Sequence, residues 1–169
     1  MSSSTTILHG CGSPVALLWL VSVIAGCGSN YVDVPPGIDL AGSWYEAENY
    51  PDSGTLRLEL AGGEWIGTYV KVGKIQREEY NFRPGETVIR GRVIDGAFAG
   101  EVLIKYPPSL MRQCPNATEK WTEIRMRFRP GLSEMTGGWR QFSIDPKDQC
   151  ERYDHGIQTY TLRRTDARS

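Results

Sequence analysis

The sequence has 169 residues, of which 40% are hydrophobic and 23% are charged, with a formal net charge of −1. A chain of this length forms one domain with a sizeable core. Because the charge is almost balanced, no overall field would attract DNA, RNA or an anionic surface, and we expect no nucleic-acid partner. The 19 Gly and 10 Pro are spread along the chain, which indicates short elements joined by many turns.

The N-terminal 26 residues contain no Lys, Arg, Asp or Glu. Within them, Val15 to Ala25 form an apolar run interrupted only by Ser22. As a helix this run would rise about 16 Å, against about 30 Å for the hydrocarbon core of a bilayer. The run is therefore too short to span a membrane, but it fits the apolar segment of a secretory signal. The alternative is a buried strand or short helix.

The run ends in Ile24-Ala25-Gly26-Cys27, which resembles the lipobox of bacterial lipoproteins. In that family the cysteine thiol receives a diacylglyceryl group, the chain is cleaved before it, and the new amino terminus is acylated with a fatty acid such as palmitate. The resemblance implies a signal peptide at 1–26, lipidation of Cys27, and a lipidated tether at 27–37. It also implies export and anchoring to the lipid bilayer of the cell envelope, at the outer membrane in a Gram-negative host. Under the alternative, Cys27 is an ordinary thiol.

The cysteine count agrees with export. If Cys11 is removed with the signal and Cys27 is lipidated, Cys114 and Cys150 remain as an even pair in an oxidising compartment. We therefore expect a disulfide between them, closing a loop of about 37 residues and stabilising the fold by about 4 kcal/mol. The rival interpretation is a metal site, which is disfavoured because neither cysteine lies in a CxxC pair or near a His cluster. We expect no metal and no cofactor.

Alternation with period two dominates from residue 38 onward, which is typical of strands with one buried face. The turn dipeptides Gly62-Gly63, Asp95-Gly96 and Pro130-Gly131 separate such segments, and Asp95-Gly96 suits a type I′ hairpin turn. No segment keeps a helical period over three turns. The alternating segments are, in chain order, 38–46, 55–60, 65–70, 87–94, 98–106, 122–129, 132–142 and 157–163.

These segments predict an all-β fold of about eight antiparallel strands over residues 38–169. Eight strands can close into an up-and-down barrel, which removes exposed edges and leaves an interior that holds side chains or one small ligand. A two-sheet β-sandwich is the alternative.

Two short motifs resemble the lipocalin and avidin-like barrels: Gly42-Ser43-Trp44 on the first strand and Arg163-Arg164 at the end of the last. The resemblance implies that Trp44 closes the base of the barrel and that a late arginine stacks on it. Gly42 would permit close backbone approach, and the stack would add about 1 kcal/mol of cation–π energy. We assign the closing role to Gly42, Trp44 and Arg163, with Arg164 as the alternative because only one of the two arginines faces inward.

Three sets of polar residues are candidates for chemistry. His155 is the one histidine after the signal segment and could serve as a catalytic base, although its neighbour Asp154 would point to the opposite strand face, and a solvated loop histidine is favoured. Four carboxylates could bind Ca²⁺, but interleaved Lys147 and Arg152 favour a solvated loop; they are Asp145, Asp148, Glu151 and Asp154. Arg125, Arg127 and Arg129 could hold an anion or form the solvated face of a strand.

Ten aromatic side chains could either line an apolar cup or fill the core. They are Trp65, Tyr69, Tyr80, Phe82, Phe98, Tyr106, Trp121, Trp139, Phe142 and Tyr160. Taken together, the sequence predicts a membrane-anchored exported barrel that binds a small apolar ligand or an envelope protein and has no catalytic role. The alternatives are a structural accessory of an envelope complex and an enzyme centred on His155.

Overall fold

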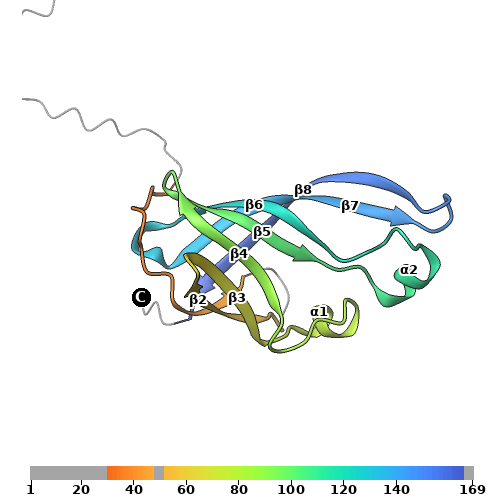
Figure 1. Cartoon of the computed structure of the whole chain (residues 1–169), viewed down its shortest axis with the longest axis horizontal. Coiled ribbons are helices and arrows are strands. Elements are labelled where there is room, and N and C mark those ends of the chain that lie inside the picture. The colour runs from red at the N-terminus through yellow and green to blue at the C-terminus, as the bar shows by residue number, and fades with distance from the viewer. Residues whose placement is uncertain (1–29, 48–51, 166–169) are drawn as a thin grey trace, which may run out of the picture.

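The computed structural model describes residues 30–47 and 52–165. Eight antiparallel strands follow one another around a closed barrel, and the last pairs with the first (Figure 1). The strands are β1 (Gly42–Glu46), β2 (Thr55–Ala61), β3 (Glu64–Lys71), β4 (Thr87–Ile94), β5 (Ala97–Ile104), β6 (Lys120–Phe128), β7 (Glu134–Asp145) and β8 (Glu151–Arg164). The predicted up-and-down barrel is confirmed, and the two-sheet sandwich does not form.

The β7–β8 hairpin is longer than its sequence pattern predicted. The two strands pair from Glu134↔Arg163 to Asp145↔Glu151, whereas β6 pairs with β7 only from Arg125↔Gly138 to Phe128↔Met135. The outer part of the hairpin therefore projects beyond the barrel wall as an arm, which Figure 1 shows at the right. Of the four carboxylates predicted to lie in a solvated loop, Asp145 is thus in β7, and Glu151 and Asp154 are in β8. In the arm, β8 is exposed at every residue from Glu151 to Thr159 and has no need for apolar alternation, which is why the pattern did not reveal it.

Three short helical segments interrupt the meander. Helix α1 (Lys74–Glu78) follows β3, α2 (Pro108–Gln113) follows β5, and the 3₁₀ turn η1 (Pro130–Leu132) follows β6. Each is too short to display a helical hydrophobic period. Among the described helices, none has the length and apolar character needed to cross a bilayer.

Residues 31–37, predicted as part of a free tether, lie against the barrel instead. The amide of Val32 donates to the Phe128 carbonyl at 2.8 Å, and the amide of Val34 donates to the Gly96 carbonyl at 3.1 Å. The side chains of Val34 and Leu40 are buried in the core. Apolar side chains and satisfied backbone groups therefore hold this segment across one end of the barrel.

That end, called the base below, is closed by a tightly packed apolar layer around Trp44. The indole is fully buried, and its Nε1–H donates to the Leu40 carbonyl at 3.0 Å. Gly91 and Gly100 pair across β4 and β5, where a Cβ on Gly100 would collide with the backbone carbonyl of Arg90. The other large, fully buried side chains of this core are Leu40, Leu56, Leu58, Ile89, Phe98, Met126, Phe128, Met135 and Leu162.

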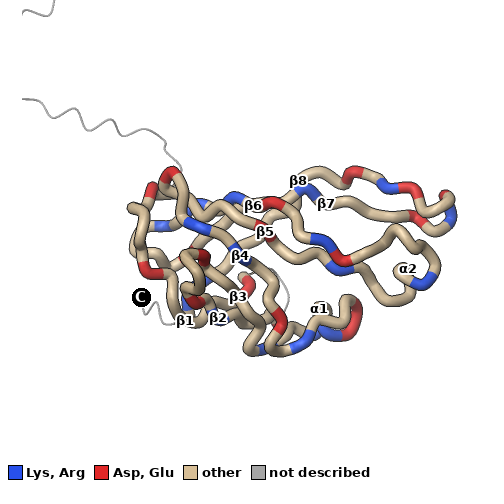
Figure 2. Tube along the Cα trace, viewed as in Figure 1, with Lys and Arg blue, Asp and Glu red and all other residues tan. Residues whose placement is uncertain are grey.

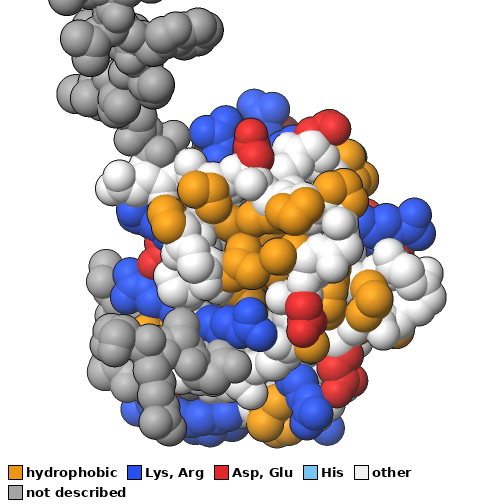
Figure 3. All heavy atoms as spheres, turned by 90° about the vertical axis from the view of Figure 1, so that its left-hand side faces the viewer, with side chains coloured by type: hydrophobic (Ala, Val, Ile, Leu, Met, Phe, Trp, Pro, Cys, Tyr) orange, Lys and Arg blue, Asp and Glu red, His pale blue; other side chains and the backbone are white. Residues whose placement is uncertain are grey.

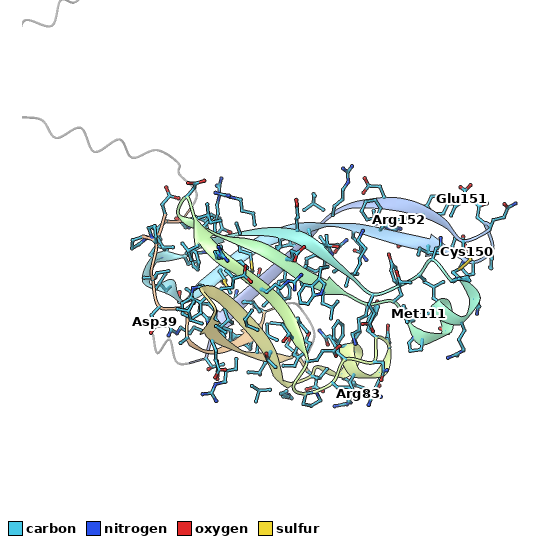
Figure 4. All side chains as sticks on the ribbon, viewed as in Figure 1. Asp39, Arg83, Met111, Cys150, Glu151 and Arg152 are labelled. Carbon is cyan, nitrogen blue, oxygen red and sulfur yellow. A yellow bond between two sulfur atoms is a disulfide. The ribbon has the colours of Figure 1, made fainter. Side chains whose placement is uncertain are left out.

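The predicted disulfide is confirmed. Cys114 and Cys150 are bonded with their Cα atoms 5.5 Å apart, and the bond joins the end of α2 to the tip of the arm (Figure 4). A second small apolar cluster, made by Tyr106, Ala117 and Ile144, surrounds the buried Cys114. The arm is therefore tied to the barrel by packing as well as by a covalent bond.

Candidate functional site

The arginine that closes the base is Arg164. Its guanidinium lies 5.6 Å from the centroid of the Trp44 ring and donates to the Ala41 carbonyl at 2.6 Å. Trp44 and Arg164 pair directly between β1 and β8, so their side chains share the inner face. Arg163 faces outward and donates to Glu134 Oε2 at 2.7 Å, so the assignment of Arg163 is corrected to Arg164. Gly42 has a φ of 129°, a conformation that favours glycine.

A cavity of about 230 Å³ occupies the opposite end of the barrel, beneath α1. This end holds the β3–β4, β5–β6 and β7–β8 connections, because successive turns of a meander alternate between the two ends. Gln158 and Thr159 are exposed and line the cavity, which therefore reaches the surface beside the arm. The other lining residues are Glu46, Tyr69, Ile75, Gln76, Tyr80, Phe82, Val88, Val102, Leu103, Ile104, Lys105, Trp139, Gln141 and Tyr160.

Glu46, at the end of β1, is the organising residue of the cavity wall. Its Oε1 accepts hydrogen bonds from the hydroxyls of Tyr69 at 2.6 Å and Tyr160 at 3.0 Å. Its Oε2 accepts from the side-chain amide of Gln76 at 3.0 Å and from the backbone amide of Gly54 at 3.1 Å. Four donors from separate segments thus converge on one carboxylate, and they draw α1, β3 and β8 together around it.

Burial sets the proton affinity of this carboxylate. Desolvation raises the pKa of Glu46 above its ordinary value, and the hydrogen bonds from Tyr69, Tyr160 and Gly54 oppose that rise. The Gly54 and Gln76 nitrogens can only donate, so the network is built for an acceptor at this position. Because hydrogen bonds fill all four acceptor directions, a proton taken up by the carboxylate would have to displace one of these donors.

Two polar atoms at the cavity are buried without a hydrogen-bond partner among the described residues: Trp139 Nε1 and Gln76 Oε1. Trp139 lies on β7 directly opposite Gln158, and its ring meets Tyr160 edge-on with centroids 5.5 Å apart. Gln76 turns its nitrogen toward Glu46 and its oxygen toward Gly73. An unsatisfied indole N–H in a cavity wall is a site where a bound molecule could supply an acceptor.

Lys105 forms the basic part of the cavity rim. Its side chain is 8% exposed, and its ammonium pairs with Glu86 and, at 3.2 Å, with Glu119. The same ammonium lies 4.8 Å from the centroid of the Phe82 ring. The lysine charge is therefore already balanced by two carboxylates and an aromatic face.

The aromatic residues singled out in the sequence fill both of the roles that were considered. Five line the cavity, and three of these are also buried in the core, to which Trp65 and Phe98 belong without lining the cavity. Trp121 lies outside the cavity lining under the guanidinium of Arg90, 4.3 Å from the ring centroid. The five in the lining are Tyr69, Tyr80, Phe82, Trp139 and Tyr160.

The structure does not bring the other candidate residues together. His155 is exposed on the arm and is not among the cavity-lining residues. Arg129 pairs with Glu134 at 3.2 Å, and its guanidinium lies 5.0 Å from the Tyr31 ring centroid. Its charge is therefore already paired with a carboxylate of the protein. Arg125 reaches the Ile94 and Asp95 carbonyls at 3.5 Å, and Arg127 is exposed.

Three of the four carboxylates near the arm tip, those of Asp145, Asp148 and Asp154, accept local hydrogen bonds, and Asp145 accepts from the Lys147 amide at 2.8 Å. Asp154 accepts from Arg140 Nε at 2.6 Å, and Asp148 accepts from the Tyr153 hydroxyl, which raises the pKa of Tyr153 to about 12. Figure 2 shows charges of both signs along this arm. Within residues 30–47 and 52–165, no group of three or more His, Cys, Asp or Glu side chains is placed to hold a metal ion. Cys27, the proposed lipidation site, lies outside the described residues.

The sequence analysis missed Glu46, although a signal for it exists. Glu46 lies two residues after Trp44, and period two places both on the inner face of β1. A carboxylate at an inward position of a barrel strand is unusual and could have been singled out on that basis. Comparison with known protein families, curated proteins and solved structures finds no match.

Proposed function

We propose that this protein is an exported, lipid-anchored barrel that binds a small organic molecule in the cavity beside Glu46 and acts without catalysis. The observation that carries the proposal is the cavity itself: an aromatic wall, one organised carboxylate, and an indole N–H that faces no partner among the described residues. Concave, largely apolar sites with a few placed polar groups are characteristic of small-molecule binding.

The lipid anchor would set the orientation of the barrel. Two residues separate Cys27 from Asn30, the first described residue, so the three Cα–Cα steps between them span at most about 10 Å. Val32 is bridged to Phe128 at the base, where Leu60 and Ile94 are also exposed, and Figure 3 shows hydrophobic side chains gathered on this end. A bilayer anchored through Cys27 would face the base, and the cavity would open away from the membrane.

Ligand binding is tested with the neutral dye N-phenyl-1-naphthylamine, whose emission rises in apolar surroundings. We expect saturable enhancement with the parent protein and its loss in Gln158→Trp, which places an indole at the mouth opposite Trp139. Ile157→Trp is the matched control, since Ile157 is exposed and is not among the cavity-lining residues. A parent protein that leaves the emission unchanged, or a Gln158→Trp variant that binds like the parent, contradicts the proposal.

Lipidation is tested separately in a bacterial host. The parent protein should fractionate with membranes and yield a mature chain that begins at an acylated Cys27. Cys27→Ala should remain uncleaved or become soluble, while Cys11→Ala should behave like the parent because Cys11 is removed with the signal. Processing and membrane retention of Cys27→Ala like those of the parent would refute the anchor.

A further inference from the structure

Glu46 has an unneutralised charge inside the barrel. Counted over whole residues, it is the single charged residue that is buried in the described part of the chain, with 4% of its surface exposed. No Lys, Arg or His of the described chain forms an ion pair with it, and its four hydrogen-bond donors are all neutral groups. Hydrogen bonds lower the cost of burying a carboxylate, but a nearby positive charge would lower it further.

The hydrogen-bond geometry restricts which cation could supply that charge. Tyr69 and Tyr160 fill the acceptor directions of Oε1, and Gly54 and Gln76 fill those of Oε2. A primary ammonium has three N–H groups that need acceptors, and Gln76 Oε1 offers one, so the others would have to compete with the donors already on the carboxylate. A fully methylated ammonium carries no N–H and interacts through its charge alone, so it can lie beside a saturated carboxylate.

The remaining cavity wall suits the same chemistry. Aromatic faces attract cations through their quadrupole, and five aromatic side chains line this cavity. The edge-on pairs Tyr69–Phe82 and Trp139–Tyr160 each have centroids 5.5 Å apart. The Lys105 ammonium already lies 4.8 Å from the Phe82 ring centroid, and its pairing with Glu86 and Glu119 leaves the charge of Glu46 unopposed.

The unpartnered Nε1–H of Trp139 adds a second requirement, an acceptor on the bound molecule. The cavity of about 230 Å³ is equivalent to about eight water molecules, which is room for a compact organic ion. We propose that the cavity binds a small quaternary ammonium compound that carries a hydrogen-bond-accepting oxygen, a molecule of the choline type. This inference rests on the proposed ligand-binding function.

The test compares choline with 3,3-dimethylbutan-1-ol, a neutral molecule of the same shape, by isothermal titration calorimetry on the intact mature protein. We expect choline to bind at least about tenfold more tightly than the alcohol. Glu46→Gln should weaken that preference, which then depends on the aromatic faces alone, and Gln158→Trp should abolish binding of both. Equal or tighter binding of the alcohol, or absence of choline binding in a protein that still binds the neutral dye, overturns the cation proposal but leaves ligand binding intact. Failure of the dye as well overturns both.

Because Glu46→Gln could unfold the domain, a second variant tests the proposal independently. Trp139→Phe removes the N–H and keeps an aromatic face in the cavity wall. We expect its affinity for choline to fall about tenfold, and its affinity for tetramethylammonium, which has no oxygen, to fall much less, by the weaker cation–π attraction of Phe alone. A parent protein that binds neither ammonium, or a Trp139→Phe variant that loses both equally, contradicts the assigned geometry.

Discussion

The guanidinium of Arg164 lies 5.6 Å from the centroid of the Trp44 ring, and it also donates a hydrogen bond to the Ala41 carbonyl at 2.6 Å. This pair joins the first strand of the barrel to the last, at the seam where β1 and β8 are in register. The contact therefore closes the ring of strands and covers the base layer at the same time.

Trp44→Ala should destabilise the domain by about 3–5 kcal/mol, because it removes a fully buried indole and leaves a cavity among side chains that cannot collapse into it. The matched control is Trp121→Ala, since Trp121 lies on the outer surface under Arg90. That variant should lose about 1 kcal/mol. Urea unfolding followed by circular dichroism measures both. Similar losses of unfolding free energy in the two variants would show that Trp44 contributes no more to stability than a surface tryptophan does.

The two neighbouring arginines should differ in their effect on stability. Arg164→Ala removes the stack on Trp44 and a backbone hydrogen bond, for a loss of about 1–2 kcal/mol. Arg163→Ala removes an ion pair with Glu134 whose arginine side chain is 51% exposed, for a loss below about 1 kcal/mol.

Thermal melts at neutral pH compare the two variants directly. Arg164→Lys is a useful third protein, since it keeps the charge and lacks the planar guanidinium. It should melt between Arg164→Ala and the parent. Closure by Arg164 is wrong if Arg163→Ala is the less stable of the two alanine variants.

The disulfide should stabilise the domain by about 4 kcal/mol, as the chain-entropy argument gives for a loop of this length. Replacement of both Cys114 and Cys150 by Ala removes the covalent tie between α2 and the arm tip. We expect lower stability in denaturant together with new proteolytic cleavage near Asp145 to Gln149, where the chain turns between β7 and β8. Unchanged stability and unchanged protease resistance would mean that packing around Tyr106 and Ile144 is sufficient alone.

The barrel could be predicted from sequence because its strands bury one face each. Leu56 and Leu58 alternate with exposed neighbours along β2, and Ile124, Met126 and Phe128 do so along β6. The alternation of apolar and polar residues along a strand determines which side chains face inward, and the short hairpin turns place strands that are consecutive in the sequence next to each other in the barrel. The β7–β8 arm was missed in part, because β8 is exposed from Glu151 to Thr159 and has no such constraint there.

The cavity could not be predicted in the same way. Tyr69, Trp139 and Tyr160 are inward residues of strands that are far apart in the sequence, and no local pattern tells a filled interior from an open one. Their relation to Glu46 depends on the stagger of strands around the closed ring. The choice of Arg164 over Arg163 likewise depends on how β1 pairs with β8. Trp44 pairs with Arg164, and a shift of this pairing by one residue would have placed Arg163 beside Trp44 instead.

Two carboxylates should affect stability with opposite pH dependence. Desolvation raises the pKa of Glu46 above its ordinary value of 4.5, so the folded protein holds that proton more tightly than the unfolded chain does. The stability that comes from the protonated form is present below 4.5 and is lost as the pH rises through the folded pKa. Desolvation also raises the pKa of Glu134, but hydrogen bonds from Arg163 and Arg129 outweigh it and lower the pKa overall. The contribution of Glu134 is therefore present above 4.5 and is lost as the pH falls.

Unfolding free energies of the parent, Glu46→Gln and Glu134→Gln, measured in urea at several pH values between mild acid and neutrality, separate the two effects. As the pH rises, the parent should lose stability relative to Glu46→Gln, because only the parent must bury an ionised carboxylate beside Tyr69 and Tyr160. Over the same change, the parent should gain stability relative to Glu134→Gln, because the ionised Glu134 pairs with Arg163. Binding of a quaternary ammonium would favour ionised Glu46. Saturating choline should therefore reduce the pH dependence of the stability difference between the parent and Glu46→Gln, and leave that between the parent and Glu134→Gln unchanged. Slopes of the same sign in the two comparisons would show that Glu46 is not the desolvated carboxylate of the cavity.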